Sequence, residues 1–259
     1  RAQVDTAGSV PASGGVNTAV RALVAAEIAR PVDSQISAMA AAIAEKHGTG
    51  SRAVLFYGSC LREQRLEGLM LDFYLIVSDY CAACDTPWLA RANRLIPPNV
   101  FPFTDNGLSA KYAVLSQDDL ARLCGEGADN VSVWARFAQP SRLVWAADKA
   151  ARTQAADAVA EAAPTFLKLA WPVTDRARRN DWRAVFEQGF SCTYRAELRA
   201  ERKSRSGSLV DSDPDYYRAL FAAAQADGVI LSDREVSDRE SRAAARRWRR
   251  LQRRGKWLS

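Results

Sequence analysis

A glycine-serine step between two apolar segments, with an acid inside the second segment, is the part of this sequence best suited to chemistry. Gly58 and Ser59 follow the apolar segment 53–57, and Asp72 lies within the apolar segment 70–77. Glycine lets the backbone approach a ligand closely, and a serine at the start of a helix can bind phosphate. An aspartate on the adjoining strand can hold Mg²⁺ against those phosphate oxygens. The pattern indicates a nucleoside triphosphate site, although a tight turn with Asp72 paired to an arginine would use the same residues.

Continuous apolar runs on both sides of this step predict the strands that must position it. We expect buried strands over 51–59 and 69–79, and a third strand over 109–116. Two helices are predicted before them over 17–47, and a helix capped by Ser116 should follow the third strand. These elements would form a small mixed sheet with flanking helices.

The remaining segments predict irregular structure and then helices. The proline-rich segment 86–107 is expected to be irregular. Alanine-rich sequence predicts a helical second half, with helices over 132–139, 149–173, 180–198 and 211–228. The order of these elements predicts an α+β chain.

The composition is that of a globular protein without a membrane-spanning helix. Of the 259 residues, 48% are hydrophobic and 25% are charged. No apolar run reaches about 18 residues, the length that a spanning helix requires. Residues 1–16 are small and polar, so we expect a flexible leader without a secretory signal.

The cysteines and the single histidine argue against zinc and against a disulfide framework. The odd number of cysteines and their spacing favour a reducing cytosol. The one CxxC pair, Cys81 and Cys84, has no second half, and His47 is the sole histidine of the sequence. A zinc site needs about four such ligands. The cysteines are Cys60, Cys81, Cys84, Cys124 and Cys192.

The C-terminal segment 242–259 concentrates the positive charge of the chain. The net charge is +6, and arginines in this segment surround Trp248, Leu251 and Trp257. Such a segment predicts an anionic partner, either lipid or nucleic acid. Two structures remain open: a helix lying on an anionic membrane surface, or a solvated helix end with Trp248 and Leu251 packed on the body.

The stretch from Tyr57 to Asp72 resembles the nucleotidyltransferase fold of the polymerase-beta type. More closely, it resembles the mitochondrial-type phosphatidate cytidylyltransferase family, the translocator assembly and maintenance proteins, and its bacterial relatives. The signature of that family is a YGS step followed by a single acid in an apolar strand, and Tyr57, Gly58, Ser59 and Asp72 match it. The common polymerase-beta pattern has a second acid two positions later, where this chain has Tyr74.

Four further blocks resemble the family in the same order, and all blocks together span about residues 50 to 220. In the first of them the histidines of the family are absent, and in the last Glu197 replaces an aspartate and Ala196 a glycine. The matching residues are Trp88 and Asn93; Lys111, Tyr112 and Val114; Ala135, Arg136, Gln139 and Pro140; and Tyr194 and Arg199.

The resemblance implies a particular domain organisation and reaction. After the leader, we expect a nucleotidyltransferase domain over 17–120 and a mainly helical domain over 121–210, for which a winged-helix-like arrangement is one option. C-terminal helices with the basic amphipathic tail would follow over 211–259. The implied reaction transfers CMP from CTP to phosphatidic acid and gives CDP-diacylglycerol and pyrophosphate, with Mg²⁺ as cofactor.

The same resemblance assigns roles near the glycine-serine step. Gly58 and Ser59 would cradle the triphosphate, Asp72 would hold Mg²⁺, and Lys111 would act on the phosphates. Glu197 is the expected second metal ligand because it stands at the acid position of the family, ahead of Asp79 and Glu67.

Further residues would bind substrate. Tyr112, Arg136, Tyr194 and Arg199 would contact CTP or the lipid phosphate. No nucleic acid is expected as a partner, and the enzyme would be cytoplasmic and peripheral to the inner face of the membrane.

Simpler explanations stay open for several of these side chains. Lys111 could be a solvated lysine at a strand end, and Arg136 could form an ion pair on a helix surface. Tyr194 and Arg199 could pack one domain on the other, and Lys203 and Arg205 could be loop charges.

Two other classes of function also remain open. One is a nucleotidyltransferase that modifies a soluble acceptor, such as a protein, a small molecule or an RNA end. The other is a non-catalytic module that binds nucleotide or nucleic acid through a phosphate-binding arm.

Overall fold

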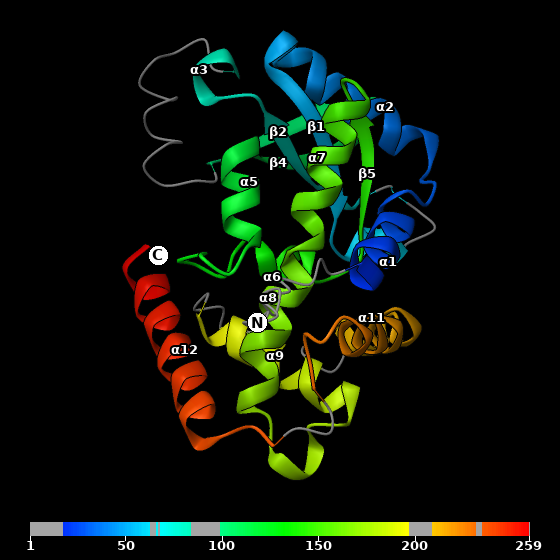
Figure 1. Cartoon of the computed structure of the whole chain (residues 1–259). Helices are drawn as coiled ribbons and strands as arrows, with labels where there is room; N and C mark the ends of the chain where they lie inside the picture. Colours follow the sequence, from blue (N-terminus) through cyan, green and yellow to red (C-terminus); the bar gives the residue numbers. More distant parts are fainter. Residues whose placement is uncertain are drawn as a thin grey trace, which may run out of the picture.

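A five-stranded mixed sheet is built from both halves of the chain (Figure 1). The computed structural model describes residues 18–62, 66, 68–83, 99–196, 209–231 and 235–258. The strands are β1 (Ser51–Tyr57), β2 (Met70–Val77), β3 (Asn99–Asp105), β4 (Leu108–Ser116) and β5 (Ser141–Ala146), in the spatial order β3-β4-β2-β1-β5. β2 and β4 run parallel, and the other neighbouring strands are antiparallel.

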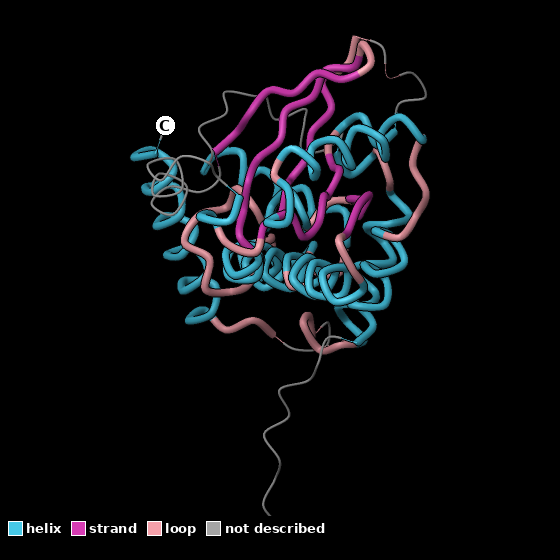
Figure 2. Tube along the Cα trace, turned by 90° about the horizontal axis from the view of Figure 1, so that it is seen from above, coloured by secondary structure: helices cyan, strands magenta, loops and turns pink. Residues whose placement is uncertain are grey.

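Alternation along the strands sorts the side chains onto two faces of the sheet. Tyr74 and Ile76 of β2 point to the face that packs against α1 (Thr18–Ile28), α5 (Gln117–Cys124) and α7 (Lys149–Ala160), called here the α7 face. Phe73 and Leu75 point to the opposite face, which α2 (Ser34–Lys46) covers and which is called the α2 face. Figure 2 shows the strands side by side, with helices on more than one side of them.

The second half of the chain is helical and shares one hydrophobic core with the α7 face. Phe166, Phe186, Phe190 and Tyr217 form the aromatic centre of this part, and the rings of Phe166 and Phe190 lie 4.7 Å apart. Gly189 permits this packing, because a Cβ there would lie 2.3 Å from Phe166 Cζ. The longer helices are α8 (Ala162–Ala170), α9 (Trp182–Ala196), α11 (Pro214–Ala226) and α12 (Asp238–Leu258).

Short helical turns complete the described elements. They are α3 (Tyr80–Ala83), α6 (Trp134–Phe137), and the 3₁₀ turns η1 (Gly48–Gly50), η2 (Ser59–Arg62), η3 (Trp171–Val173) and η4 (Arg176–Arg178). The predicted α+β class, a small mixed sheet with flanking helices followed by a mainly helical part, is confirmed.

Side-chain caps fix the starts of several helices. Ser116 Oγ accepts a hydrogen bond from Asp119 N at 3.1 Å, as the sequence predicted for α5. Asp213 caps the predicted helix α11 in the same way, through Tyr216 N at 3.2 Å. Each cap satisfies a backbone N–H that has no partner within the helix.

Two strands were not predicted. β3 lies within segment 86–107, which was expected to be irregular, and β5 lies between two predicted helices. β3 is an edge strand with alternating exposure, where Pro102 is tolerated because edge strands leave some N–H groups unpaired. Asn106 and Gly107 both have positive φ and join β3 to β4, and this Asn-Gly pair is a hairpin signal. β5 also places the sheet partly beyond residue 120, the expected end of the first domain.

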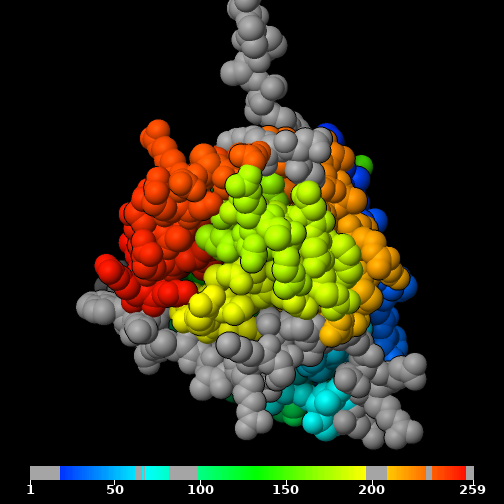
Figure 3. Space-filling model, turned by 90° about the horizontal axis from the view of Figure 1, so that it is seen from below, coloured from blue at the N-terminus to red at the C-terminus, as the bar shows by residue number. Residues whose placement is uncertain are grey.

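The basic C-terminal segment forms α12, and one side of this helix belongs to the core. Ala244, Trp248 and Leu251 are buried. Trp248 Nε1 donates to Leu169 O at 3.0 Å, and its ring lies 5.8 Å from the ring of Trp134. Figure 3 shows α12, in red, against the yellow-green surface that includes α9. The packing of Trp248 and Leu251 on the body, one of two alternatives considered, is therefore confirmed.

The outer side of α12 carries the positive charge. Its exposed arginines are Arg239, Arg242, Arg246, Arg249, Arg250, Arg253 and Arg254. Across the described ranges, no helix has the length and apolar character needed to cross a bilayer.

Candidate active site

The turn after β1 brings backbone against the carboxylate of Asp72. Gly58 has φ of +95°, a conformation that side chains other than glycine rarely adopt. A Cβ at this position would lie 3.1 Å from Asp72 Oδ2. The absence of a side chain at Gly58 therefore lets the carboxylate and the turn approach closely. The sequence predicted this neighbourhood, and the structure confirms it.

Asp72 and Lys111 form an ion pair next to this turn. Asp72 is opposite Tyr57 in the antiparallel β1–β2 pair and opposite Lys111 in the parallel β2–β4 pair. Lys111 Nζ lies 3.3 Å from Asp72 Oδ1. Oδ1 is buried, and among the described residues it has no partner with hydrogen-bond geometry. Among the described residues, the charged partner of the carboxylate is thus a lysine beside the glycine turn, and no described arginine takes the place that the simpler explanation gave it.

The sheet is exposed to solvent around this pair. Met70 and Val100 have 50% and 58% of their surface exposed, which is unusual for large apolar side chains of a sheet. Strand alternation and register place both on the α7 face, the same face as Asp72 and Lys111. The Lys111 side chain itself is 52% exposed. A ligand can therefore reach the pair from the end of the face where β3 and β4 lie.

Ser59 follows Gly58 in the chain and starts η2. It is exposed, and Leu61 N donates to Gly58 O at 3.3 Å within this turn. The structure therefore brings four predicted residues together, namely Gly58, Ser59, Asp72 and Lys111.

Tyr112 is not brought to this site. Its neighbour Lys111 faces Asp72, so Tyr112 must point to the α2 face. There its ring is buried against Phe101 and Phe103, and its hydroxyl lies 2.9 Å from His47 Nε2. The prediction that Tyr112 binds substrate finds no support in this position.

Arg136 and Tyr194 come from helices next to the α7 face. Arg136 is half-buried on α6, beside Phe137, whose ring packs 6.4 Å from Tyr57 and 5.2 Å from Tyr74. α6 thus adjoins the strand that carries Asp72. Tyr194 is half-buried on α9 and packs against the hydrophobic core.

Several predicted residues lie outside the described residues. They are Glu197 and Arg199, the weaker candidates Glu67, Lys203 and Arg205, and the block residues Trp88 and Asn93. Asp79 is described, and its Oδ1 accepts a hydrogen bond from Cys81 N at 2.8 Å.

The described side chains could hold Mg²⁺ only if other ligands, such as substrate phosphates, complete its coordination. No cluster of three or more histidine, cysteine, aspartate or glutamate side chains suited to a metal occurs in the described part of the chain. Mg²⁺ commonly uses one or two carboxylates, with water and substrate phosphates filling the other positions. The unsatisfied Oδ1 of Asp72 and the space left by Gly58 fit that arrangement. Asp72 would hold the ion only together with a bound triphosphate.

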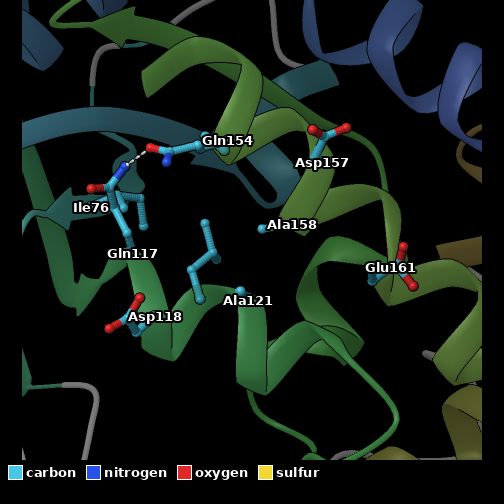
Figure 4. Close-up of a pocket in the computed structure, with 10 residues that line it drawn as sticks. Ile76, Gln117, Asp118, Ala121, Gln154, Asp157, Ala158 and Glu161 are labelled. Atoms are coloured by element: carbon cyan, nitrogen blue, oxygen red, sulfur yellow. Dashed lines mark hydrogen bonds between the residues drawn. The ribbon is translucent and has the colours of Figure 1, made fainter. Parts of the chain in front are cut away.

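A separate cavity on the α7 face does not belong to this site. It has a volume of about 330 Å³ and lies between α5 and α7, with Ile76 at its base (Figure 4). Asp118, Asp157 and Glu161 line it. Arg21 pairs with Asp157 at 2.6 Å and with Glu161 at 2.5 Å, so two of these three carboxylates are already neutralised.

A buried ion pair escaped the sequence analysis. Glu27 on α1 and Arg142 on β5 are each more than nine-tenths buried, and Arg142 Nη1 lies 2.5 Å from Glu27 Oε1. The pair joins positions 115 residues apart. An arginine inside the segment 141–146 was a weak signal, because that segment was not recognised as a strand.

Comparisons with known proteins give limited information. No protein-family model matches this chain, and no curated protein matches it. Among solved structures, a nucleotidyltransferase-like protein from Exiguobacterium sibiricum 255-15 is similar over 85% of this chain and 75% of that chain, with 12% sequence identity and a TM-score of 0.32. A likeness at this level does not establish a shared fold or activity.

Proposed function

We propose that this protein is a metal-dependent nucleotidyltransferase that uses the site formed by Gly58, Asp72 and Lys111 on the α7 face of the sheet. One observation carries the proposal: the buried Oδ1 of Asp72 has an ion-pair contact to Lys111 Nζ at 3.3 Å but no hydrogen bond to a described residue, and the carboxylate lies beside a glycine turn. A buried oxygen without a hydrogen bond costs stability and is frequent where a ligand or ion binds. An exposed sheet end beside it gives a triphosphate access.

In this reaction an oxygen of the acceptor attacks the α-phosphorus of the nucleoside triphosphate. A new P–O bond forms to the acceptor, the bond between the α-phosphorus and the bridging oxygen breaks, and pyrophosphate leaves with the electron pair. Mg²⁺, when bound, would supply charge neutralisation on the phosphates. The protein contributes mainly position and electrostatic stabilisation.

Each residue of the site has a distinct part in this proposal. Asp72 would hold the cation, which would neutralise charge on the triphosphate. Lys111, whose side chain is half-exposed, would contact the phosphates. Gly58 leaves room for these groups, and Ser59 donates its hydroxyl to a phosphate oxygen.

The finer proposal names CTP as the nucleotide and phosphatidic acid as the acceptor. It is supported by the resemblance of the sequence around Gly58, Asp72, Lys111 and Arg136 to the phosphatidate cytidylyltransferase family. The outer arginines of α12 support work at an anionic membrane surface. The proposed location is therefore the cytoplasmic side of a membrane, with the protein bound peripherally.

A soluble acceptor is the second candidate for the same site. It is favoured by the burial of Trp248 and Leu251, because these side chains are then not available for insertion into a membrane. The two candidates share Asp72 and Lys111 and differ only in the acceptor.

The test supplies the protein with Mg²⁺ and each of the four nucleoside triphosphates, with and without vesicles containing phosphatidic acid. Pyrophosphate release and nucleotide attached to lipid are measured together. We expect both with CTP and vesicles. Asp72→Asn should lower the rate by about 10²-fold or more, and Asp215→Asn, an exposed acid on α11, should not.

The outcomes test the acceptor, the nucleotide and the type of reaction separately. Pyrophosphate release without lipid product would overturn phosphatidic acid as the acceptor and retain nucleotidyl transfer to another acceptor. Lipid product with another nucleotide would overturn CTP. Failure of every nucleotide to react or bind would overturn the nucleotidyltransferase itself.

A further inference from the structure

A second cavity lies on the opposite side of the Gly58 turn from Asp72. Its volume is about 540 Å³, within the range of small-molecule sites. The segment between α1 and α2 forms one wall, and the turn after β1 forms another. Apolar side chains make up most of the lining, including Val32, Ile36, Phe56, Leu61 and Leu66.

Two arginines add positive charge to this cavity. Arg30 and Arg142 both line it, and both contact the same carboxylate. Glu27 Oε1 lies 2.5 Å from Arg142 Nη1, and Glu27 Oε2 lies 3.2 Å from Arg30 Nη1. The single negative charge of Glu27 is therefore shared by two guanidinium groups. Asp33, the other charged side chain of the lining, caps α2 by accepting from Gln35 N at 2.8 Å, so its charge faces the helix amides.

Arg142 is fixed in place and retains free donors. Its Nη1 donates to Glu27 and to Ser141 O at 2.9 Å. Its Nε and Nη2 make no hydrogen bond to any described residue. Neither atom is fully buried, because neither belongs to the buried polar atoms that lack a partner in the described chain. These donors are therefore open to the cavity that Arg142 lines. A guanidinium edge with two free donors matches a carboxylate or a phosphate.

We propose that this cavity binds a small amphiphilic anion, with its carboxylate or phosphate monoester on Arg142 and Arg30 and its apolar body against Val32, Ile36 and Leu61. The lining offers both polar and apolar surface, which favours an anion with a short apolar body over a fully polar one. This site does not depend on nucleotidyl transfer, since Asp72 and Lys111 lie on the α7 face and Phe56 on the α2 face.

The test uses four soluble probes of one chain length and measures binding to the full protein by calorimetry. Hexyl phosphate and hexanoate carry the expected head groups, and hexanol and hexylamine carry a neutral and a cationic one. Inorganic phosphate is the fifth probe. We expect hexyl phosphate or hexanoate to bind, with the stronger of the two identifying the head group, and inorganic phosphate to bind about tenfold or more weakly.

Variants locate the site. Arg30→Gln should weaken binding about tenfold or more. Its matched control is Arg218→Gln, because Arg218 is also an exposed arginine in an i,i+3 ion pair. The double variant Glu27→Gln/Arg142→Gln removes both buried charges together and should abolish binding, whereas removing Arg142 alone would leave Glu27 buried and unpaired.

Two further readouts remain informative if the double variant does not fold. Val32→Phe fills the cavity from its half-exposed rim and should block hexyl phosphate. The ligand should also slow labelling of the Cys60 thiol, which lines the cavity, and leave the exposed Cys81 thiol unaffected.

Three results would overturn the site: no binding of either amphiphilic anion to the folded protein, equal binding of hexanol and hexyl phosphate, or binding unchanged in Arg30→Gln and Val32→Phe. None of these results bears on Asp72 or on nucleotide turnover.

Discussion

Lys111 Nζ lies 3.3 Å from Asp72 Oδ1, across a register pair of the parallel strands β2 and β4. The lysine side chain is 52% exposed and the aspartate side chain 21% exposed. A pair of this exposure stabilises a protein by about 0–1 kcal/mol. Stability therefore does not explain why the chain keeps an acid within the apolar strand β2, whereas the proposed nucleotide site would.

Lys111→Met tests whether this pair serves binding or folding. Because the ion pair contributes little to folding, we expect the free energy of unfolding to change by less than about 1 kcal/mol. Nucleotide affinity should fall about tenfold or more, since a charge-assisted contact to phosphate is lost. Calorimetric titration with CTP gives the nucleotide affinity, and denaturant unfolding gives the free energy of unfolding. Lys149→Met, at an exposed position of α7, is the control. A large loss of stability with normal nucleotide affinity would assign Lys111 a structural role.

Gly58→Ala should weaken nucleotide binding in addition to straining the backbone. Alanine at φ of +95° is strained, and its Cβ would lie 3.1 Å from Asp72 Oδ2. Gly107→Ala and Gly228→Ala share the positive φ but have no atom within 4 Å of the added Cβ. All three variants should lose about 1–2 kcal/mol of stability, whereas Gly58→Ala alone should lose nucleotide binding. Equal nucleotide binding in the three folded variants would contradict the close approach of turn and carboxylate.

The stability of the protein should fall as the pH rises above about 9. Burial raises the pKa of Cys124 above its ordinary value of 9.0, and burial together with Glu27 and Asp213 raises the pKa of Tyr216 above 10.0. In alkali the unfolded chain loses these protons while the folded chain keeps them, so unfolding becomes more favourable as pH rises. The stabilisation is complete below the ordinary values and is lost above them.

Tyr216→Phe removes the contribution of Tyr216 to this pH dependence and leaves that of Cys124. Above about pH 10 each proton difference makes the slope of unfolding free energy about −1.4 kcal/mol per pH unit. The variant should therefore show a shallower decline than the wild type in denaturant unfolding at pH 10 to 11. Parallel curves would show that Tyr216 loses its proton equally easily in both states.

The outer arginines of α12 should determine binding to anionic membranes. Deleting 242–259 is a poor test, because it removes the buried Trp248 and Leu251. Changing Arg242, Arg246, Arg249, Arg250 and Arg253 to glutamine leaves the buried side intact. Each arginine near an anionic surface contributes about 1 kcal/mol, so sedimentation with anionic vesicles should fall by about a hundredfold or more. Unchanged sedimentation, or equal binding to neutral vesicles, would contradict a peripheral membrane role.

The sequence predicted the central part of the fold well. β1, β2 and β4 are continuous apolar runs, and Ser116 and Asp213 are local capping signals that need no tertiary information. β3 and β5 were missed because both are edge strands, which bury less of their surface and have weaker patterns. For β3 the Asn106-Gly107 turn was a usable signal.

The candidate site was predictable in part for a similar reason. The closeness of Gly58 and Asp72 follows from two neighbouring strands, whereas the Lys111 contact depends on the parallel pairing of β2 with β4. The expectation that Lys111 and Tyr112 act in one site ignored strand alternation, because adjacent residues point to opposite faces. The Glu27–Arg142 pair joins α1 to β5 and has no local signature.

The most direct test of a divalent cation held by Asp72 against a nucleoside triphosphate is CTP affinity measured with and without Mg²⁺. We predict that Mg²⁺ raises the affinity of the wild type and of Asp215→Asn about tenfold or more, and that it has no such effect on Asp72→Asn. Thermal unfolding confirms that all three proteins are folded. An equal response to Mg²⁺ in Asp72→Asn, or no response in the wild type, would contradict the account.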